Sequence, residues 1–269
     1  MSVRRVFRIT LEYDGGDFAG WQRQAQDERT VQGCLEVALS EIAGESVSAI
    51  GSGRTDAGVH ALGQVASAVL ATRLDPATLQ RALNARLPRD MAAIDVAAAP
   101  AGFDARRCAT GKLYRYSIWN GRVRSPLRAS RFHFVPTLLD LAAMREAAAA
   151  LVGEHDFAAF QAAGSSVQSS VRRLDRLALE GEPGGEIHFE AQGSGFLRHM
   201  VRNLAGTLIE VGQGRRQASS LPDLLASCDR ARAGPTAPPQ GLALIRVEYP
   251  DELLRDPGAP DDFALESGV

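Results

Sequence analysis

An α+β fold is predicted for this 269-residue chain by two repeating patterns and by its apolar content. Apolar and polar residues alternate in residues 6–13 and 113–119, as they do in half-buried strands. In residues 31–42 and 138–151 apolar residues recur every three or four positions, as on one face of a helix. Apolar residues make up 45% of the chain, so it can bury a full core, and its length suits one large domain or two small ones.

The first half of the chain is predicted to alternate strands and helices. After the first strand, Thr30 is placed to cap a helix over residues 31–42. Residues 46–50 are predicted to form a short strand. An Asp-Pro start and a Pro stop bound a second helix over residues 75–88, and a further strand is expected at 93–97.

The second half repeats both patterns around one long loop. Strands are expected where apolar residues alternate, and helices where they form a stripe. The loop has neither pattern and is rich in arginine. The predicted elements are, in order, a strand at 113–119, the loop at 121–136, a helix at 138–151, strands at 174–179 and 186–191, a helix at 197–208 and a strand at 242–249.

Charge is unevenly distributed along the chain, although the formal net charge is only −2. Residues 105–131 contain eight basic residues and no acid, whereas residues 251–269 contain six acids and one arginine. A segregated basic stretch of this kind can neutralise phosphates, so it favours a nucleic-acid partner. The alternative for any single arginine is a solvated face, and since Lys112 is the only lysine, arginine is over-represented throughout.

The cysteines and the hydropathy pattern indicate a cytoplasmic protein. Cys34, Cys108 and Cys228 form no Cys-x-x-Cys pair, so neither a zinc knuckle nor a disulfide framework is predicted, and a reducing compartment fits. No stretch approaches the ~18 consecutive apolar residues of a membrane span. We therefore predict that no membrane is involved.

Residues 51–60, Gly-Ser-Gly-Arg-Thr-Asp-Ala-Gly-Val-His, are the strongest candidate for a functional loop. Three glycines allow close backbone approach to a ligand, and they flank the carboxylate of Asp56. The loop does not match a dinucleotide fingerprint, a phosphate-binding P-loop or a nucleophilic-serine elbow. An Asx-type turn, in which Asp56 bonds only its own backbone, is the simpler alternative.

Together with other motifs, this loop resembles the tRNA pseudouridine synthase A family, whose members isomerise uridines in the anticodon arm of tRNA. The similarity follows the family's order over roughly residues 5 to 249, so a chance match to one short pattern is excluded. The matching blocks are Tyr13-Asp14-Gly15, Phe18, Gly20-Trp21-Gln22-Arg23-Gln24, Thr30-Val31-Gln32, Gly53-Arg54-Thr55-Asp56-Ala57-Gly58-Val59-His60-Ala61, Asn84, Leu87-Pro88, Phe103-Asp104-Ala105-Arg106, Tyr114-Arg115-Tyr116, His155-Asp156-Phe157, Gly195-Phe196-Leu197, Met200-Val201-Arg202-Asn203 and Gly241-Leu242.

The resemblance implies two similar α+β lobes, each a mostly antiparallel sheet with helices on one face, around a central basic cleft. We place an N-terminal lobe with the Asp56 loop at residues 1–105, a C-terminal lobe at 106–250 and a disordered acidic tail at 251–269. A short internal similarity is consistent with a duplication, because residues 12–18 and 190–196 carry Glu, a glycine-rich turn and Phe at the same offsets.

The activity implied is the isomerisation of uridine to pseudouridine at positions 38, 39 and 40 of the tRNA anticodon stem-loop. The bond from C1′ to N1 breaks, the uracil turns, and C5 joins C1′. Breaking a glycosidic bond develops positive charge on the sugar, which an adjacent carboxylate stabilises or captures covalently. By resemblance Asp56 is that carboxylate, and the sequence leaves open whether it attacks C1′ or removes a sugar proton.

The resemblance also implies roles for four other residues. Arg202 is the expected salt-bridge partner of Asp56, Tyr114 is expected to stack on the target uracil, and Arg54 is expected to fill the space that the flipped base leaves. Leu244 or Leu242 is expected to form an apolar wall of the uracil site. The structural alternatives are a solvent-facing helix residue for Arg202, an ordinary strand residue for Tyr114 and core positions for the leucines.

Other conspicuous side chains are predicted to be structural. His133, His155, His188 and His199 show no metal-ligand spacing and are assigned no catalytic task. For His60, a structural role is favoured over a contact with RNA. Residues 20–24 are expected either to bind tRNA or to support the site, with Trp21 as a packing anchor in the second case.

The implied reaction needs neither cofactor nor metal, and the implied assembly is a homodimer across which each tRNA lies. Two other classes of protein remain open from the sequence. A non-catalytic RNA-binding module would explain the basic stretch but not a carboxylate in the best-marked loop. A base-excising glycosylase would use Asp56 in the same way, but it would release free uracil and not conserve the mass of the RNA.

Overall fold

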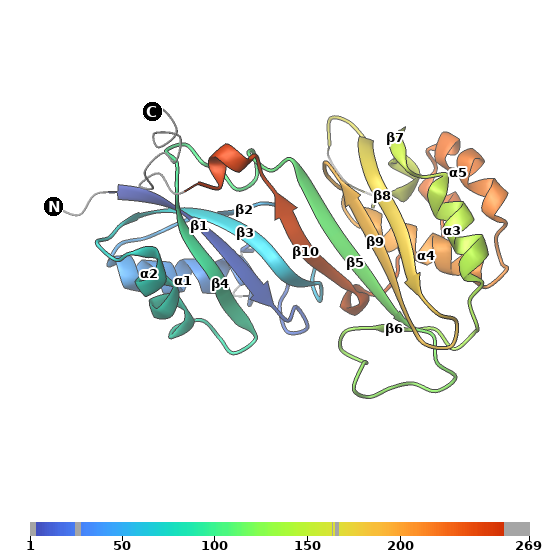
Figure 1. The fold of residues 1–269 in the computed structure, drawn as a ribbon, viewed down its shortest axis with the longest axis horizontal. Helices are drawn as coiled ribbons and strands as arrows, with labels where there is room; N and C mark the ends of the chain where they lie inside the picture. The colour runs from blue at the N-terminus through green and yellow to red at the C-terminus, as the bar shows by residue number, and fades with distance from the viewer. Residues whose placement is uncertain (1–3, 25–27, 163, 165–166, 256–269) are drawn as a thin grey trace, which may run out of the picture.

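The computed structural model describes residues 4–24, 28–162, 164 and 167–255. In these residues strands and helices alternate along one continuous sheet, as Figure 1 shows. The mixed class and the mostly antiparallel pairing confirm the predicted α+β fold.

The N-terminal half begins its helices where the sequence predicts, because the caps are local. Its elements are β1 (Arg4–Tyr13), α1 (Val31–Ala43), β2 (Ala49–Gly51), β3 (His60–Ala71), α2 (Pro76–Asn84) and β4 (Met91–Ala99). The hydroxyl of Thr30 accepts a hydrogen bond from the Gly33 amide at 3.2 Å. A carboxylate oxygen of Asp75 accepts one from the Thr78 amide at 2.8 Å. Each bond satisfies an amide that the first turn of a helix leaves without a partner.

The C-terminal half contains more strands and more α-helices than the N-terminal half. Its elements are β5 (Gly111–Trp119), β6 (His133–Phe134), α3 (Leu141–Ala149), β7 (Gly153–Asp156), β8 (Val171–Gly181), β9 (Glu186–Gly193), α4 (Met200–Gly212), α5 (Leu221–Ser227) and β10 (Leu242–Glu248). Asp140 caps α3 by accepting from the amides of Ala142 and Ala143 at 2.9 and 3.0 Å. The loop expected at 121–136 is present, apart from the two residues of β6.

The two halves share one strand order. The main path of the sheet is β4-β1-β3-β10-β5-β9-β8-β7, and β2 and β6 add to β3 and β5. In the N-terminal half β4 lies beside β1, which pairs with β3, which pairs with β2. In the C-terminal half β10 lies beside β5, which pairs with β9, which pairs with β8. Each half is thus a βαββαβ unit in the spatial order fourth, first, third, second.

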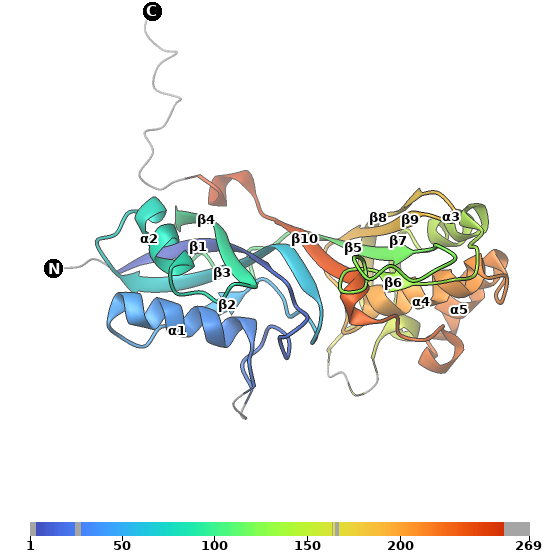
Figure 2. The same cartoon turned by 90° about the horizontal axis from the view of Figure 1, so that it is seen from below.

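Strand β10 joins the halves at the middle of the sheet. It runs parallel to β3, with Leu244 opposite Ala61, and antiparallel to β5, with Leu244 opposite Tyr114. Seen edge-on in Figure 2, α1 and α4 lie on the same face of the sheet. One cluster of buried apolar residues extends from β1 and α1 to α4, so both halves contribute to a common core.

One long strand was not predicted, namely β3. Its residues His60–Ala71 are rich in small side chains and do not alternate, because the strand is central and its residues are buried on both faces for most of its length. A strand covered on both faces has no polar side that would mark the period of two. The same explanation does not apply to β7 and α5, which were missed because they are only four and seven residues long.

Two expectations about the halves change or stay untested. The internal similarity does not link equivalent strands, because residues 12–18 follow the first strand of one half and residues 190–196 begin in the third strand of the other. The proposed lobe boundary near residue 105 lies between β4 and β5, in a sheet that continues across it, and remains a prediction.

In the predicted tail, Asp251–Leu253 form a 3₁₀ turn, and residues 256–269 lie outside the described residues.

Candidate active site

The loop that carries Asp56 connects β2 to β3 and is held from both ends. The hydroxyl of Ser52 donates to Gln64 Oε1 at 2.6 Å, and the buried hydroxyls of Thr55 and Tyr13 lie 2.8 Å apart in a hydrogen bond. The Asp56 carbonyl accepts from the Val59 amide at 3.1 Å, which closes a turn around Gly58. Gly58 has a φ of 77°, a conformation that favours glycine. The loop therefore presents Asp56 on a fixed turn.

Residues 20 and 21 support this loop from behind. The Trp21 amide donates to the Thr55 carbonyl at 3.0 Å. Gly20 has a φ of 98°, and a Cβ at this position would come within 2.8 Å of the same carbonyl. The indole of Trp21 is buried and fills the space in front of Gly51, where a Cβ would lie 2.3 Å from the ring. Trp21 is therefore a packing anchor for the loop.

The carboxylate of Asp56 meets two basic side chains at the start of α4. Arg202 donates from Nη1 to Asp56 Oδ2 at 3.1 Å. His199 Nε2 lies 3.5 Å from the same oxygen. Asp56 comes from the N-terminal half and both partners come from the C-terminal half, 146 residues further along the chain in the case of Arg202. The salt-bridge partner implied by the family resemblance is thus in contact with the carboxylate.

Arg202 is held so that its guanidinium points across the junction between the halves. Its Nε donates to the Ala237 carbonyl at 2.8 Å, while the Ala237 amide donates to the Arg202 carbonyl at 3.1 Å. The adjacent Asn203 is fully buried and donates to the Phe160 carbonyl at 2.7 Å. These bonds fix the first turn of α4 against two loops. Asp56 also faces the N-terminal end of this helix, where the helix dipole favours an anion.

The two oxygens of the Asp56 carboxylate have different surroundings. Arg202 and His199 both contact Oδ2, while Oδ1 has no hydrogen-bond partner among the described residues. The side chain of Asp56 is 29% exposed and that of Arg202 is 13% exposed. A charge-assisted hydrogen bond in such a half-buried place contributes about 1.5–3 kcal/mol. The arrangement fixes Oδ2 by contacts with the C-terminal half and leaves Oδ1 without a partner among the described residues.

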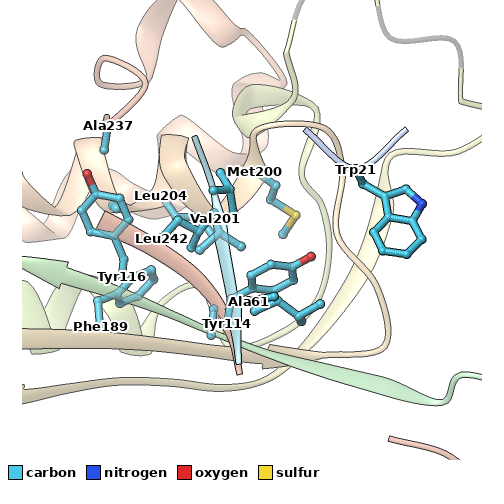
Figure 3. Packing of buried hydrophobic residues seen from close by; sticks show 14 of the residues in the cluster. Trp21, Ala61, Tyr114, Tyr116, Phe189, Met200, Val201, Leu204, Ala237 and Leu242 are labelled. Atoms are coloured by element: carbon cyan, nitrogen blue, oxygen red, sulfur yellow. The ribbon is translucent and has the colours of Figure 1, made fainter. Parts of the chain in front are cut away.

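Tyr114 lies on β5 close to this carboxylate. Its ring packs edge-on against Phe196, with centroids 5.1 Å apart. Burial raises the pKa of the Tyr114 phenol well above its usual value, and the nearby Tyr13 and Asp56 raise it further. Figure 3 shows Tyr114 and Tyr116 projecting from the same side of β5 toward α4. The Tyr114 phenol therefore stays neutral at physiological pH and presents an aromatic ring near the site.

The leucines and Arg54 differ in how they relate to the site. Leu244 is fully buried beside Tyr114, and Leu242 is nearly so beside Tyr116. Arg54 is exposed, and no ion pair or hydrogen bond of its side chain occurs among the described residues. The structure brings Asp56, Arg202 and Tyr114 into one region, places Leu244 beside Tyr114 on the neighbouring strand, and leaves Arg54 exposed at the surface.

The histidines divide into structural ones and one at the site. His60 is buried; its Nδ1 accepts from the Gly15 amide at 3.0 Å and its Nε2 lies 2.9 Å from the Ser130 carbonyl. This agrees with the predicted structural role. The absence of metal-ligand spacing predicts no catalytic task for His199, but such spacing does not reveal a contact with a carboxylate. Its position directly before Met-Val-Arg-Asn is the signal in the sequence that could have marked it.

The basic stretch is partly neutralised by carboxylates. Arg115 pairs with Glu190 at 2.7 Å and Arg128 with Glu186 at 2.6 Å. Arg131 lies 3.4 Å from Asp14. Four exposed arginines have no ion pair among the described residues, and they are Arg106, Arg107, Arg122 and Arg124. These four are the part of the stretch that is available to phosphates.

Metal-binding clusters and membrane-spanning helices are both absent from the described residues. These residues contain no group of three or more His, Cys, Asp and Glu side chains arranged to hold a metal ion. None of their helices is both long and apolar enough to cross a membrane. Cys34, Cys108 and Cys228 are all free thiols.

Comparison with known proteins extends the match beyond the site. A family model described as tRNA pseudouridine synthase matches residues 9–106 and 147–250. A tRNA pseudouridine synthase A of Myxococcus xanthus is 47% identical over 262 residues, which cover 97% of this chain and 98% of the relative. The enzymes of that name from Geotalea uraniireducens and Solidesulfovibrio magneticus are 46% and 49% identical, covering 91% and 90% of this chain and 100% and 90% of the relatives.

A solved Cbf5-Nop10-Gar1 complex aligns with 89% of this chain and 58% of its own, but at 12% identity and a TM-score of 0.35 it is too distant to inform the assignment. The sequence relatives are decisive, since they span nearly the whole chain, including the loop of Asp56 and the start of α4. This chain belongs to the tRNA pseudouridine synthase family.

Proposed function

We propose that this protein converts uridine to pseudouridine at positions 38, 39 and 40 in the anticodon stem-loop of tRNA. The family assignment supports the reaction, and the resemblance described above supports the positions. The observation that carries the proposal is the pairing of Asp56 with Arg202 at 3.1 Å, which holds the carboxylate at the junction of the two halves.

Asp56 is the catalytic carboxylate in this proposal. Its free oxygen, Oδ1, faces the sugar, where it either attacks C1′ or takes a proton from the sugar as the bond from C1′ to N1 breaks. The detached uracil then turns, and a bond forms between C5 and C1′ as the carboxylate leaves C1′ or the proton returns to the sugar. C5 loses its proton and N1 gains one, so the product has the mass of the substrate. The sequence of steps requires no cofactor or metal.

The other predicted residues have supporting roles. Arg202 pairs with the Asp56 carboxylate and fixes its place, and Tyr114 offers its ring to the flipped base, a contact worth about 1–3 kcal/mol per base in other RNA-binding proteins. Arg54, which is exposed, contacts the backbone where the base has left the stack. Leu244 forms the apolar layer next to Tyr114, and its complete burial means that it acts mainly by supporting that ring.

The remaining parts of the proposal concern tRNA binding and assembly. The exposed arginines at positions 106, 107, 122 and 124 bind the phosphate backbone of the anticodon arm. The active form is a homodimer that acts in the cytoplasm. Equilibrium sedimentation of the purified protein tests the dimer, and a monomer at micromolar concentration would remove that part.

The activity is tested by release of tritium from unmodified tRNA that carries [5-³H]uridine. The wild-type protein and Asp56→Ala are compared without added metal or cofactor. The expected result is release by the wild type only, with the tRNA intact and no free uracil. Transcripts that keep a uridine at one of positions 38, 39 and 40 assign the target.

Each other outcome identifies a different function. Free uracil in place of a retained base would indicate a glycosylase. Binding of tRNA without release of label would favour the RNA-binding module. Release by a folded Asp56→Ala equal to that of the wild type would keep the activity but remove Asp56 from its centre. Circular dichroism of the variant confirms that it is folded.

A further inference from the structure

His199 occupies the N-cap position of α4 but does not cap the helix. Its backbone is left-handed, with φ of 59° and ψ of 4°, and its side chain makes no capping hydrogen bond. Only His199 and Cys228 among the described non-glycine residues have a positive φ. A residue held in this sparsely populated conformation needs support from its surroundings, and such residues gather at functional sites. From this position the imidazole lies next to Asp56.

The imidazole lies at the oxygen that Arg202 also contacts. His199 Nε2 is 3.5 Å from Asp56 Oδ2, and Arg202 Nη1 is 3.1 Å from the same atom. The histidine side chain is 26% exposed, so it lies at the edge of the site. A separation of 3.5 Å exceeds a normal hydrogen bond, but such contacts in ligand-free enzymes often shorten when substrate binds.

The charges around His199 favour its neutral form. Burial is the largest effect that lowers the pKa of the imidazole, and Arg202, Arg198 and Arg230 lower it further. Asp56 opposes them by raising the pKa. A neutral imidazole with its proton on Nε2 can donate to the carboxylate without cancelling its charge. Arg202 then balances the charge of the Asp56 carboxylate, and His199 orients that carboxylate.

We propose that His199 is a positioning residue that donates a hydrogen bond from Nε2 to Asp56 Oδ2 when substrate is bound. Two donors on Oδ2, from Arg202 and His199, fix the plane of the carboxylate and hold Oδ1 toward the sugar. The role of Oδ1 rests on the function proposed above. The contact between His199 and Asp56 itself does not, and it is measured separately.

The first test is the titration of the histidines by NMR. The protein is labelled with ¹³C and ¹⁵N in its five histidines, and the His199 signal is the one absent from His199→Asn. The pKa of His199 is expected to be lower in Asp56→Asn than in the wild type, because the variant removes the charge that raises it. An unchanged pKa would overturn the proposed contact, whether or not the protein is active.

The second test compares two substitutions in the tritium-release assay. Asparagine at position 199 tolerates the left-handed backbone, but its side chain is too short for the amide to reach Oδ2. Glutamine is longer, so His199→Gln can place an amide near the position of Nε2. We expect His199→Asn to lower kcat about tenfold with KM within twofold, and His199→Gln to recover part of kcat. Wild-type kcat in His199→Asn, or a change in KM alone, would contradict the positioning role.

Thermal unfolding of both variants separates this effect from a loss of folding. If neither variant folds, the His199 signal is assigned in the wild type from through-bond connections to its backbone, and the NMR comparison of the wild type with Asp56→Asn still decides the contact. Absence of tritium release by the wild type would refute the proposed function and not the contact. A changed pKa together with unchanged kcat would show that the two side chains interact but that the interaction does not position Asp56.

Discussion

The two halves of this protein have the same strand order and contribute opposite charges to the proposed active site. The N-terminal half provides the carboxylate of Asp56 on the connection between β2 and β3, and the C-terminal half provides Arg202 and His199 at the start of α4. A glycine turn and the side-chain bonds of Ser52 and Thr55 fix the first region, whereas the bonds of Arg202 and the buried Asn203 fix the second. Neither half contains the paired site alone, so the site depends on how the halves are joined.

The junction itself is built from residues that are far apart in the chain. Leu244 of β10 lies opposite Ala61 of β3 and Tyr114 of β5. Strand β10, the last strand in the chain, thus lies between β3, which follows the Asp56 loop, and β5, which carries Tyr114. A packing defect in β10 should therefore disturb both β3 and β5 next to the site, while a defect elsewhere in either half should disturb one of them at most.

Leu244→Ala should have the largest effect on stability. Removing a fully buried leucine leaves a cavity that costs about 2–5 kcal/mol, and at this position the cavity opens between the halves. Leu62→Ala is the matched control, because Leu62 on β3 is 43% exposed. Urea unfolding measures both variants. A cost for Leu244→Ala no greater than that for Leu62→Ala would show that the junction does not depend on β10 packing.

Arg202→Gln should have the next largest effect, and on activity more than on stability. The variant removes a charge-assisted hydrogen bond worth about 1.5–3 kcal/mol, which corresponds to a loss in kcat/KM of roughly 10- to 150-fold. Arg198→Gln is the control, because Arg198 is exposed near the same helix start and does not bond to Asp56. Equal losses in the two variants would mean that general positive charge, and not the pair across the halves, supports the reaction.

The parts of the fold that could be predicted are those set by neighbours in the chain. Thr30 and Asp75 cap their helices as expected, since the capped amides are only three residues away. Strand β3 could not be predicted, because it is central and buried on both faces. The placement of β10 between β3 and β5 depends on pairing with strands from both halves, which local patterns do not encode.

The same distinction applies to the site. Glycine spacing marks the Asp56 loop, but its contact with Arg202, 146 residues away, was expected only from the family resemblance. The spacing of His199 to the other histidines fits no metal site and so predicts no role for it. Its relevance depends on a left-handed backbone and a distance to Asp56 that only the folded chain defines.

Tyr114→Phe should change activity little, because the ring and not the hydroxyl is the proposed contact. No hydrogen bond of this hydroxyl occurs among the described residues, and its raised pKa keeps it neutral. We expect kcat within about threefold of wild type, a free-energy change below about 0.7 kcal/mol. A loss of a hundredfold or more in the tritium assay would show that the hydroxyl takes part in the chemistry.

Tyr116→Phe is the matched control on the same strand. Its hydroxyl donates to the Pro238 carbonyl at 2.9 Å, so its removal should cost about 0.5–1.5 kcal/mol of unfolding free energy. The two variants compare two hydroxyls on β5. The Tyr116 hydroxyl bonds to the segment before β10, whereas the Tyr114 hydroxyl has no partner among the described residues. Equal stability of the two variants would contradict this distinction.

Mild acid should affect the C-terminal half more than the N-terminal half, with the smallest effect of the series. Burial lowers the pKa of His133 and His188, both in the C-terminal half, and Nδ1 of His133 is buried without a partner among the described residues. A lowered pKa in the folded state means that the unfolded chain binds more protons. Their contribution to stability is complete above the unfolded pKa of about 6.5 and is lost as the pH falls through the folded pKa.

Hydrogen exchange at pH 7.5 and 5.5 measures this difference, with rates corrected to protection factors. Amides of β5 and β9 should lose more protection than those of β1 and β3, because the only histidine of the N-terminal half is His60. Carboxylates with lowered pKa, such as Asp90 beside Arg29, stay ionised in this range and do not contribute. His133→Phe should reduce the difference between the halves. An equal loss of protection in both halves would show that the continuous sheet opens as one unit. The halves would then share a strand order without having separate stabilities.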